Sequence, residues 1–190
     1  IVVADSQYVN FEVGSRRNTA AMRGVVWYLV NRRTPALLER IVAYDYETVQ
    51  APLRMYVSVY GPDGVRWLSG HGDMIRQRVR AGYEFWSNRF ATTVRLPRYL
   101  VGMLVRVETH SRYRRPEFFK SIYLRGVYPK RRWVVQCTWP AAADIAHSVA
   151  NAESLAVRVT DRGDDETRSV VVQAQWCPKM AQSQSMKRPE

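Results

Sequence analysis

The chain has 190 residues and a mass of 22.0 kDa, the size of one domain with or without extensions. Hydrophobic residues make up 46% of it, which excludes disorder along the whole chain, and no apolar run is long enough for a transmembrane helix. Its two cysteines, Cys137 and Cys177, exclude a disulfide-dense scaffold and a four-cysteine zinc site. They could be two buried thiols or one disulfide. What remains is a basic globular protein of net charge +12.

The first third of the chain predicts an arm, a strand and a helix. Residues 1–22 combine an apolar start with a polar middle, which indicates an extended N-terminal arm. Residues 23–31 are rich in β-branched and aromatic side chains, as a strand is. Thr34 and Pro35 are typical of a helix start, and the apolar residues that follow at helical spacing predict a helix over about 35–48.

From residue 53 onward the apolar residues recur with a period of two, which predicts strands. Glycine-rich turns separate several of them. The expected strands are 53–60, 74–80, 84–96, 103–107, 118–128 and 133–139. Pro140 then opens an alanine-rich segment that predicts a second helix over about 140–151. Residues 155–160 and 168–176 predict a hairpin with an acidic turn, and 178–190 a polar tail.

This order of elements predicts a mainly β fold, an antiparallel β-sandwich with two added short helices and extended termini. The strands are not separated by regular helices, which argues against a parallel doubly wound sheet. The expected organisation is an arm over 1–22, a single sandwich domain over 23–177 and a tail over 178–190.

The sequence offers little for catalysis, so we expect a non-enzyme without cofactor or metal. None of the common nucleophile, phosphate-loop, dinucleotide or zinc-protease motifs occurs. His71 beside Asp73 makes at most half a metal site. His110 ends a strand, and His147 falls on the second predicted helix. The acidic cluster around 161–166 lacks the spacing of an EF-hand loop and indicates a solvated hairpin tip.

The basic residues are the most informative feature. Arginine accounts for 25 of the 29 basic residues, and its planar fork grips phosphate and stacks on bases. Codon bias in a GC-rich genome could raise arginine over lysine, but it does not explain the net charge. We expect these residues to contact nucleic acid: Arg76, Arg78, Arg80, Arg112, Arg114, Arg115, Lys120, Arg125, Lys130, Arg131 and Arg132.

Residues 53 to about 142 resemble the PLAT, or lipoxygenase-homology, β-sandwich. The likeness is carried by the strand and turn at 57–64, the strand pair at 99–107, the aromatic-led strand at 118–124 and the Cys-x-Trp end at 137–139. This resemblance implies a sandwich that binds lipid or protein and has no catalytic role. A Trp two residues after the Cys, instead of three, and a helix before residue 53 depart from the pattern.

The composition, rich in Arg, Trp and Tyr and poor in Lys, resembles accessory proteins of divergent mitochondrial ribosomes. The leading hypothesis is therefore a non-catalytic structural component of a large ribonucleoprotein, contacting ribosomal RNA and neighbouring proteins in the mitochondrial matrix, or otherwise in the cytoplasm. One alternative is a PLAT-like module that docks on a membrane surface or an acidic protein. Another is a viral coat protein, although arginine in a coat protein usually gathers in one terminal arm.

Overall fold

A computed structural model of the whole chain describes residues 2–14, 18–31, 40–46, 53–69, 73–79, 89–96, 101–114, 122, 129–149 and 155–177. These residues form two β-sheets. The strands of the larger sheet are β1 (Val2–Glu12), β2 (Thr19–Leu29), β4 (Arg54–Gly61), β5 (Gly64–Leu68), β8 (Leu104–Tyr113), β9 (Lys130–Pro140), β10 (Val157–Gly163) and β11 (Thr167–Cys177). The smaller sheet contains β3 (Arg40–Tyr46), β6 (Met74–Arg78) and β7 (Arg89–Arg95).

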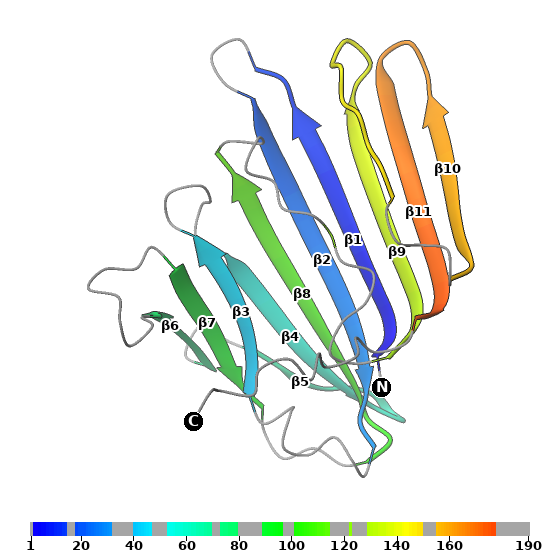
Figure 1. Cartoon of the computed structure of the whole chain (residues 1–190). Coiled ribbons are helices and arrows are strands. Elements are labelled where there is room, and N and C mark those ends of the chain that lie inside the picture. The colour runs from blue at the N-terminus through cyan, green and yellow to red at the C-terminus, as the bar shows by residue number, and fades with distance from the viewer. Residues whose placement is uncertain are drawn as a thin grey trace, which may run out of the picture.

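The larger sheet has the order β10-β11-β9-β1-β2-β8-β4-β5, and the smaller one has the order β3-β7-β6 (Figure 1). All neighbours are antiparallel except β1 and β9, which run parallel. The sandwich prediction is confirmed at the level of a mainly β fold with packed sheets. The larger sheet is mixed, however, because β1 is inserted between β2 and β9, so residues 2–12 of the predicted arm are a central strand.

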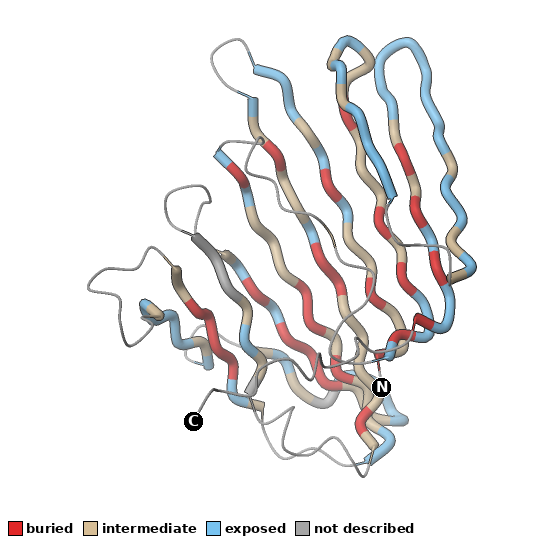
Figure 2. The backbone as a smooth tube through the Cα atoms, viewed as in Figure 1, coloured by how far each residue is buried: buried red, intermediate tan, exposed pale blue. Residues whose placement is uncertain are grey.

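One face of the larger sheet is packed, and buried residues recur along most of its strands (Figure 2). At one end the small sheet covers β4 and β8, whose Met55, Val57 and Val105 form a core with Val94 of β7. At the other end, residues of 141–149 pack on Trp133 and Trp139 of β9 and on β11. We call this packed side the inner face and the opposite side the outer face.

The absence of a side chain at Gly24 leaves room on the inner face for the side chain of Thr109. Gly24 on β2 is paired with Thr109 on β8, and a Cβ added there would lie 2.8 Å from the Thr109 Oγ1. Strand glycines often mark such close approaches.

The predicted helix over 35–48 is wrong where the structure describes it, because residues 40–46 form β3. Ile41 and Ala43 pack against the core while Val42 between them is 39% exposed, so the true period is two. Pairing with β7 supplies the tertiary contacts that override the apparent helical spacing. The remaining residues of this prediction lie outside the described ranges.

The predicted helix over 140–151 is also wrong in the described residues to 149. Pro140 ends β9, a turn covers 141–143, and residues 144–149 have no regular secondary structure. Ala143 and Ile145 pack on the inner face while the residues between and after them are exposed. This alternation belongs to an extended strap, in which alanine propensity is overridden by packing on Trp133 and Trp139.

Most predicted strands are confirmed, with bounds shifted by a few residues. The strand expected at 118–128 falls outside the described residues, apart from Ile122, which packs against the inner face. The acidic hairpin is confirmed. Its turn is held by Asp164, whose carboxylate accepts hydrogen bonds from the backbone N–H groups of Glu166 and Thr167 at 3.0 and 2.6 Å.

Candidate functional site

The outer face of the larger sheet gathers arginines from several strands. Side chains alternate along a strand, and the strand register therefore fixes which residues share this face. Glu12 and Glu108 are its acidic residues among those the structure describes. Its arginines there are Arg23, Arg54, Arg106, Arg112, Arg132, Arg158 and Arg162. The excess of cations makes this face complementary to an anionic ligand.

Glu108 is the centre of an ion cluster on the outer face. Its carboxylate is 12% exposed and lies 2.6 Å from the Arg23 Nε and 2.9 Å from the His110 Nε2, and Arg106 donates to its other oxygen. Burial alone would raise the pKa of Glu108. The hydrogen bonds from Arg23 and His110 and the charges of Arg106 and Arg23 outweigh it, so this pKa lies below its ordinary value. The hydrogen bond to Glu108 and the charge of this carboxylate raise the pKa of Arg23.

The cluster should make stability depend on pH in the acid range. Because the pKa of Glu108 is lower in the folded chain, its contribution is complete above the unfolded value of about 4.3 and is lost as the pH falls through the folded pKa. We expect Glu108→Gln to lower the free energy of unfolding by about 1–2 kcal/mol at pH 7, and by less at pH 3. Urea unfolding at both pH values measures the difference.

Glu12→Gln is the matched control for that experiment. Glu12 also accepts from an arginine, Arg112 at 2.8 Å, but both side chains are exposed, by 47% and 61%. An exposed pair of this kind contributes about 0–1 kcal/mol. Equal acid sensitivity of the wild type and the Glu108 variant would show that the cluster does not stabilise the fold.

Aromatic side chains are interleaved with these charges. Trp27 and Tyr60 stand with ring centroids 5.3 Å apart, and the Tyr56 ring meets His110 edge-on at 5.7 Å. Tyr8 lies with its centroid 5.9 Å from the Arg23 guanidinium and is itself 41% exposed. These contacts fix the arginines and aromatics beside one another, and both kinds of side chain can stack on a planar ligand.

Four outer-face arginines have no acidic partner among the described residues: Arg54, Arg132, Arg158 and Arg162. All four are exposed. Their guanidinium donors are therefore available to an anion, unlike those of Arg23 and Arg106, which Glu108 occupies.

Two hollows indent the outer face. The first, of about 810 Å³, lies over Ala21 and is bordered by Tyr8, Arg23, Arg54 and His110. Ala21 explains its place, because a small side chain there stands between larger ones on β1 and β8. The second, of about 450 Å³, lies over β9, β10 and β11. Its polar side chains are Arg132, Arg158, Gln173 and Gln175.

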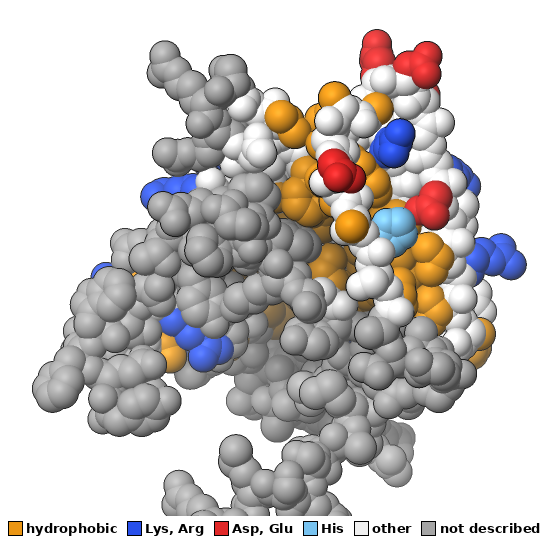
Figure 3. All heavy atoms as spheres, turned by 45° about the horizontal axis from the view of Figure 1, so that its top comes forward, with side chains coloured by type: hydrophobic (Ala, Val, Ile, Leu, Met, Phe, Trp, Pro, Cys, Tyr) orange, Lys and Arg blue, Asp and Glu red, His pale blue; other side chains and the backbone are white. Residues whose placement is uncertain are grey.

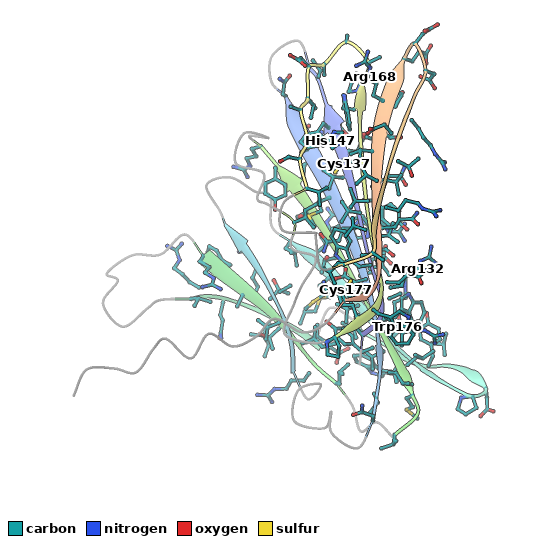
Figure 4. The ribbon with its side chains drawn as sticks, turned by 45° about the vertical axis from the view of Figure 1, so that its right-hand side comes forward. Arg132, Cys137, His147, Arg168, Trp176 and Cys177 are labelled. Carbon is teal, nitrogen blue, oxygen red and sulfur yellow. The ribbon has the colours of Figure 1, made fainter. Side chains whose placement is uncertain are left out.

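Trp176 stands beside the second hollow in an unusual conformation. Among the described non-glycine residues, Trp176 alone has a positive φ, of 54°. The residue is 71% exposed. This backbone breaks the alternation, so that Gln175 and Trp176 are both exposed while Cys177 is buried. Figure 4 shows Trp176 and Arg132 on the side of the sheet away from Cys137 and His147. The Arg131 guanidinium lies 5.6 Å from the Trp176 ring centroid.

The structure divides the predicted contact residues into several groups. Arg112 and Arg132 lie on the outer face, and Arg131 flanks it at Trp176. Arg114 is exposed just after β8. Lys130, in contrast, is buried against Asp5, with 2.6 Å between Nζ and Oδ2. Predicted residues outside the described ranges are Arg80, Arg115, Lys120 and Arg125.

Arg76 and Arg78 form a separate group on the small sheet. They share one side of β6, since their guanidiniums lie 3.8 and 4.9 Å from the centroid of the same ring, Phe90. Sequence reasoning missed Arg54, Arg158 and Arg162, which stand alone in the sequence and meet the others only through strand register.

The inner face holds the remaining chemically interesting side chains. His147 on the strap lies 3.5 Å from Asp161, and its ring centroid is 6.4 Å from that of Trp139. Cys137 shares this face, but burial raises the pKa of its thiol, which disfavours the thiolate that a nucleophile needs. Hydrophobic side chains gather on the described part of this face, and acidic ones lie at the tip of the β10–β11 hairpin (Figure 3).

Three further observations concern the described residues. Both cysteines are free thiols, and no cluster of three or more His, Cys, Asp or Glu side chains suited to a metal occurs in the described part of the chain. The described ranges also contain no helix long and apolar enough to cross a membrane. His71 lies outside them.

Comparison with known proteins identifies a fold and no family. No family model and no curated protein matches the sequence. A crystal structure from Parabacteroides distasonis ATCC 8503, described as a candidate protease, superposes with a TM-score of 0.68 at 9% identity. The alignment covers 100% of this chain and 38% of that one, so this chain corresponds to little more than a third of the longer protein. At this identity the likeness concerns the fold alone.

Proposed function

We propose that this chain is a non-catalytic RNA-binding domain that serves as a structural component of a large ribonucleoprotein, with a mitochondrial ribosome as the first candidate. The observation that carries the proposal is the charge of the outer face, which holds seven arginines and only two glutamates among the described strands. Four of these arginines have no described acidic partner, and aromatic rings stand among them. Phosphate contacts and stacking are the interactions that such a surface provides.

A salt titration with a fluorescent oligouridine tests the proposal. If the four unpartnered arginines each neutralise a phosphate, the logarithm of the binding constant should fall with the logarithm of salt concentration with a slope of about −3. Fluorescence polarisation at several salt concentrations measures it. Absence of binding at low salt would refute the proposal. Binding to anionic vesicles that survives high salt would favour the PLAT-like docking module instead.

A second candidate function follows from the structural comparison. The same fold occupies 38% of a longer chain described as a candidate protease, so this domain could likewise be a non-catalytic part of a longer, enzyme-bearing protein. Immunoblotting of cell extracts and gradient fractions with an antibody against the domain distinguishes the two candidate functions. An endogenous polypeptide much larger than 22.0 kDa would support the second candidate, and co-sedimentation with an RNase-sensitive particle the first.

A further inference from the structure

We infer that the outer face holds one single-stranded segment of nucleic acid at two separate subsites, the hollow over Ala21 and the hollow beside Trp176. The inference rests on the proposed function and deepens it, because it names the form of nucleic acid and its path. The first hollow is lined by Arg54 and the exposed ring of Tyr8. The second is lined by Arg132 and Arg158, and the exposed Trp176 directly follows its lining residue Gln175 in the chain. That combination binds a phosphate and an unstacked base together.

The first subsite is built around Tyr8. Its ring is 41% exposed, and the neighbouring Arg23 is held by Glu108 at 2.6 Å, which keeps the rim of the hollow in place. Arg54 and His110 stand across the hollow on the adjacent strands β4 and β8. A base can stack on Tyr8 over the small Ala21 side chain, while Arg54 donates to the phosphate that follows.

The second subsite is built around Trp176. A tryptophan at positive φ is rare, and strained residues of this kind gather at ligand sites. Its conformation leaves 71% of the residue exposed beside Arg131, where the ring can accept a base. Arg132 and Arg158 supply donors for phosphate, and the amides of Gln173 and Gln175 can bond base edges or sugar hydroxyls.

Strand register gives the path between the subsites. From Ala21 on β2, the sheet passes through β1 and β9 to β11, which is three strand spacings or about 14 Å. Along the strands, Ala21 aligns through Asn10 and Thr138 with Ser169, four to six residues from Gln173 and Gln175. The centres are therefore about 20–25 Å apart along a diagonal that passes Tyr8 and Gln136. A flexible single strand can follow this diagonal and present its bases, whereas a duplex keeps its bases stacked.

Two subsites joined by one ligand predict a dependence on length. An oligouridine of about twelve nucleotides spans both and should bind at least about tenfold more tightly than one of about three, which occupies one subsite at a time. Arg54→Gln and Arg158→Gln each disable one subsite. Each variant should weaken the binding of the long oligomer about tenfold. It should weaken the binding of the short oligomer only about twofold, because the short oligomer can still bind at the other subsite.

Arg162→Gln is the matched control, since Arg162 is an exposed, unpartnered arginine of the outer face outside both hollows. This variant should weaken the binding of the long and the short oligomer by the same small factor. Fluorescence polarisation measures all affinities, and circular dichroism checks folding. Failure of both lengths to bind the wild type would refute the proposed function itself. Equal affinity for both lengths, tighter binding of a duplex of equal length, or an effect confined to one of the two variants would leave that function standing and overturn the two-subsite inference.

Discussion

Replacing Lys130 with methionine is expected to lower the free energy of unfolding by about 3–5 kcal/mol, among the largest effects of any single change in the chain. The Lys130 and Asp5 side chains are only 10% and 7% exposed, and 2.6 Å separates Nζ from Oδ2. Without the ammonium group, Asp5 would remain as a buried charge whose described side-chain partner is the Gln7 amide at 3.5 Å. Urea unfolding followed by circular dichroism measures the loss.

The double variant Asp5→Leu with Lys130→Met separates the unpaired charge from the loss of packing. Two apolar side chains can replace a buried ion pair with little loss of stability, so the double variant should be more stable than Lys130→Met alone. If the single variant loses less than about 1 kcal/mol, the carboxylate is hydrated in the folded protein and the buried pair is not a structural element. The parallel pairing of β1 with β9 would then depend on the sheet contacts alone.

The second large effect concerns binding. Changing all four unpartnered outer-face arginines to glutamine should weaken oligouridine binding about a hundredfold or more at low salt, and should flatten the salt dependence by about 0.7 unit per arginine, which removes most of the slope of about −3. The variant carries Arg54→Gln, Arg132→Gln, Arg158→Gln and Arg162→Gln. Fluorescence polarisation against salt concentration measures both quantities.

A charge-matched variant controls for the lower net charge. It changes four exposed arginines away from the outer face, namely Arg76, Arg78, Arg95 and Arg168, to glutamine. If binding depends on the outer face, this control should lose much less affinity than the first variant. Equal losses in the two variants would mean that net charge alone attracts the RNA and that no face is specific for it.

The sequence was sufficient for most of the strands, but not for β1, β3 and β5 or for the arrangement of the sheets. Alternating residues such as Met55, Val57 and Val59 identified β4 because one face of that strand is packed. The central position of β1 could not be predicted, since it depends on parallel pairing with β9, whose partner residues are more than 120 positions away. Without knowledge of that partner, the apolar start followed by a polar segment predicts an arm.

The two helix predictions failed for a shared physical reason. In 40–46 and 141–149, local propensity or apparent spacing favoured a helix, while contacts from distant strands favoured extended chain. Val42 and Val149 are apolar residues within these segments, yet both are exposed, by 39% and 41%. Burial decides the period, and burial is a tertiary property.

The candidate site shows the same limit. Composition drew attention to arginine, and two of the residues it singled out, Arg112 and Arg132, lie on the outer face with the other arginines. Density of charge along the chain was a poor guide to position, because Lys130 sits within the most basic stretch and is buried against Asp5. Arg54 and Arg158 are isolated in the sequence and become neighbours of other arginines only in the assembled sheet.

The most direct test of the account is to map the RNA contact by ultraviolet crosslinking to oligouridine, followed by mass spectrometry of the crosslinked peptides. The account predicts crosslinks at the exposed aromatic residues of the outer face, above all Tyr8 and Trp176. Crosslinks confined to the small sheet around Phe90, or to the inner face around His147, would contradict it and would place the ligand on a surface other than the outer face.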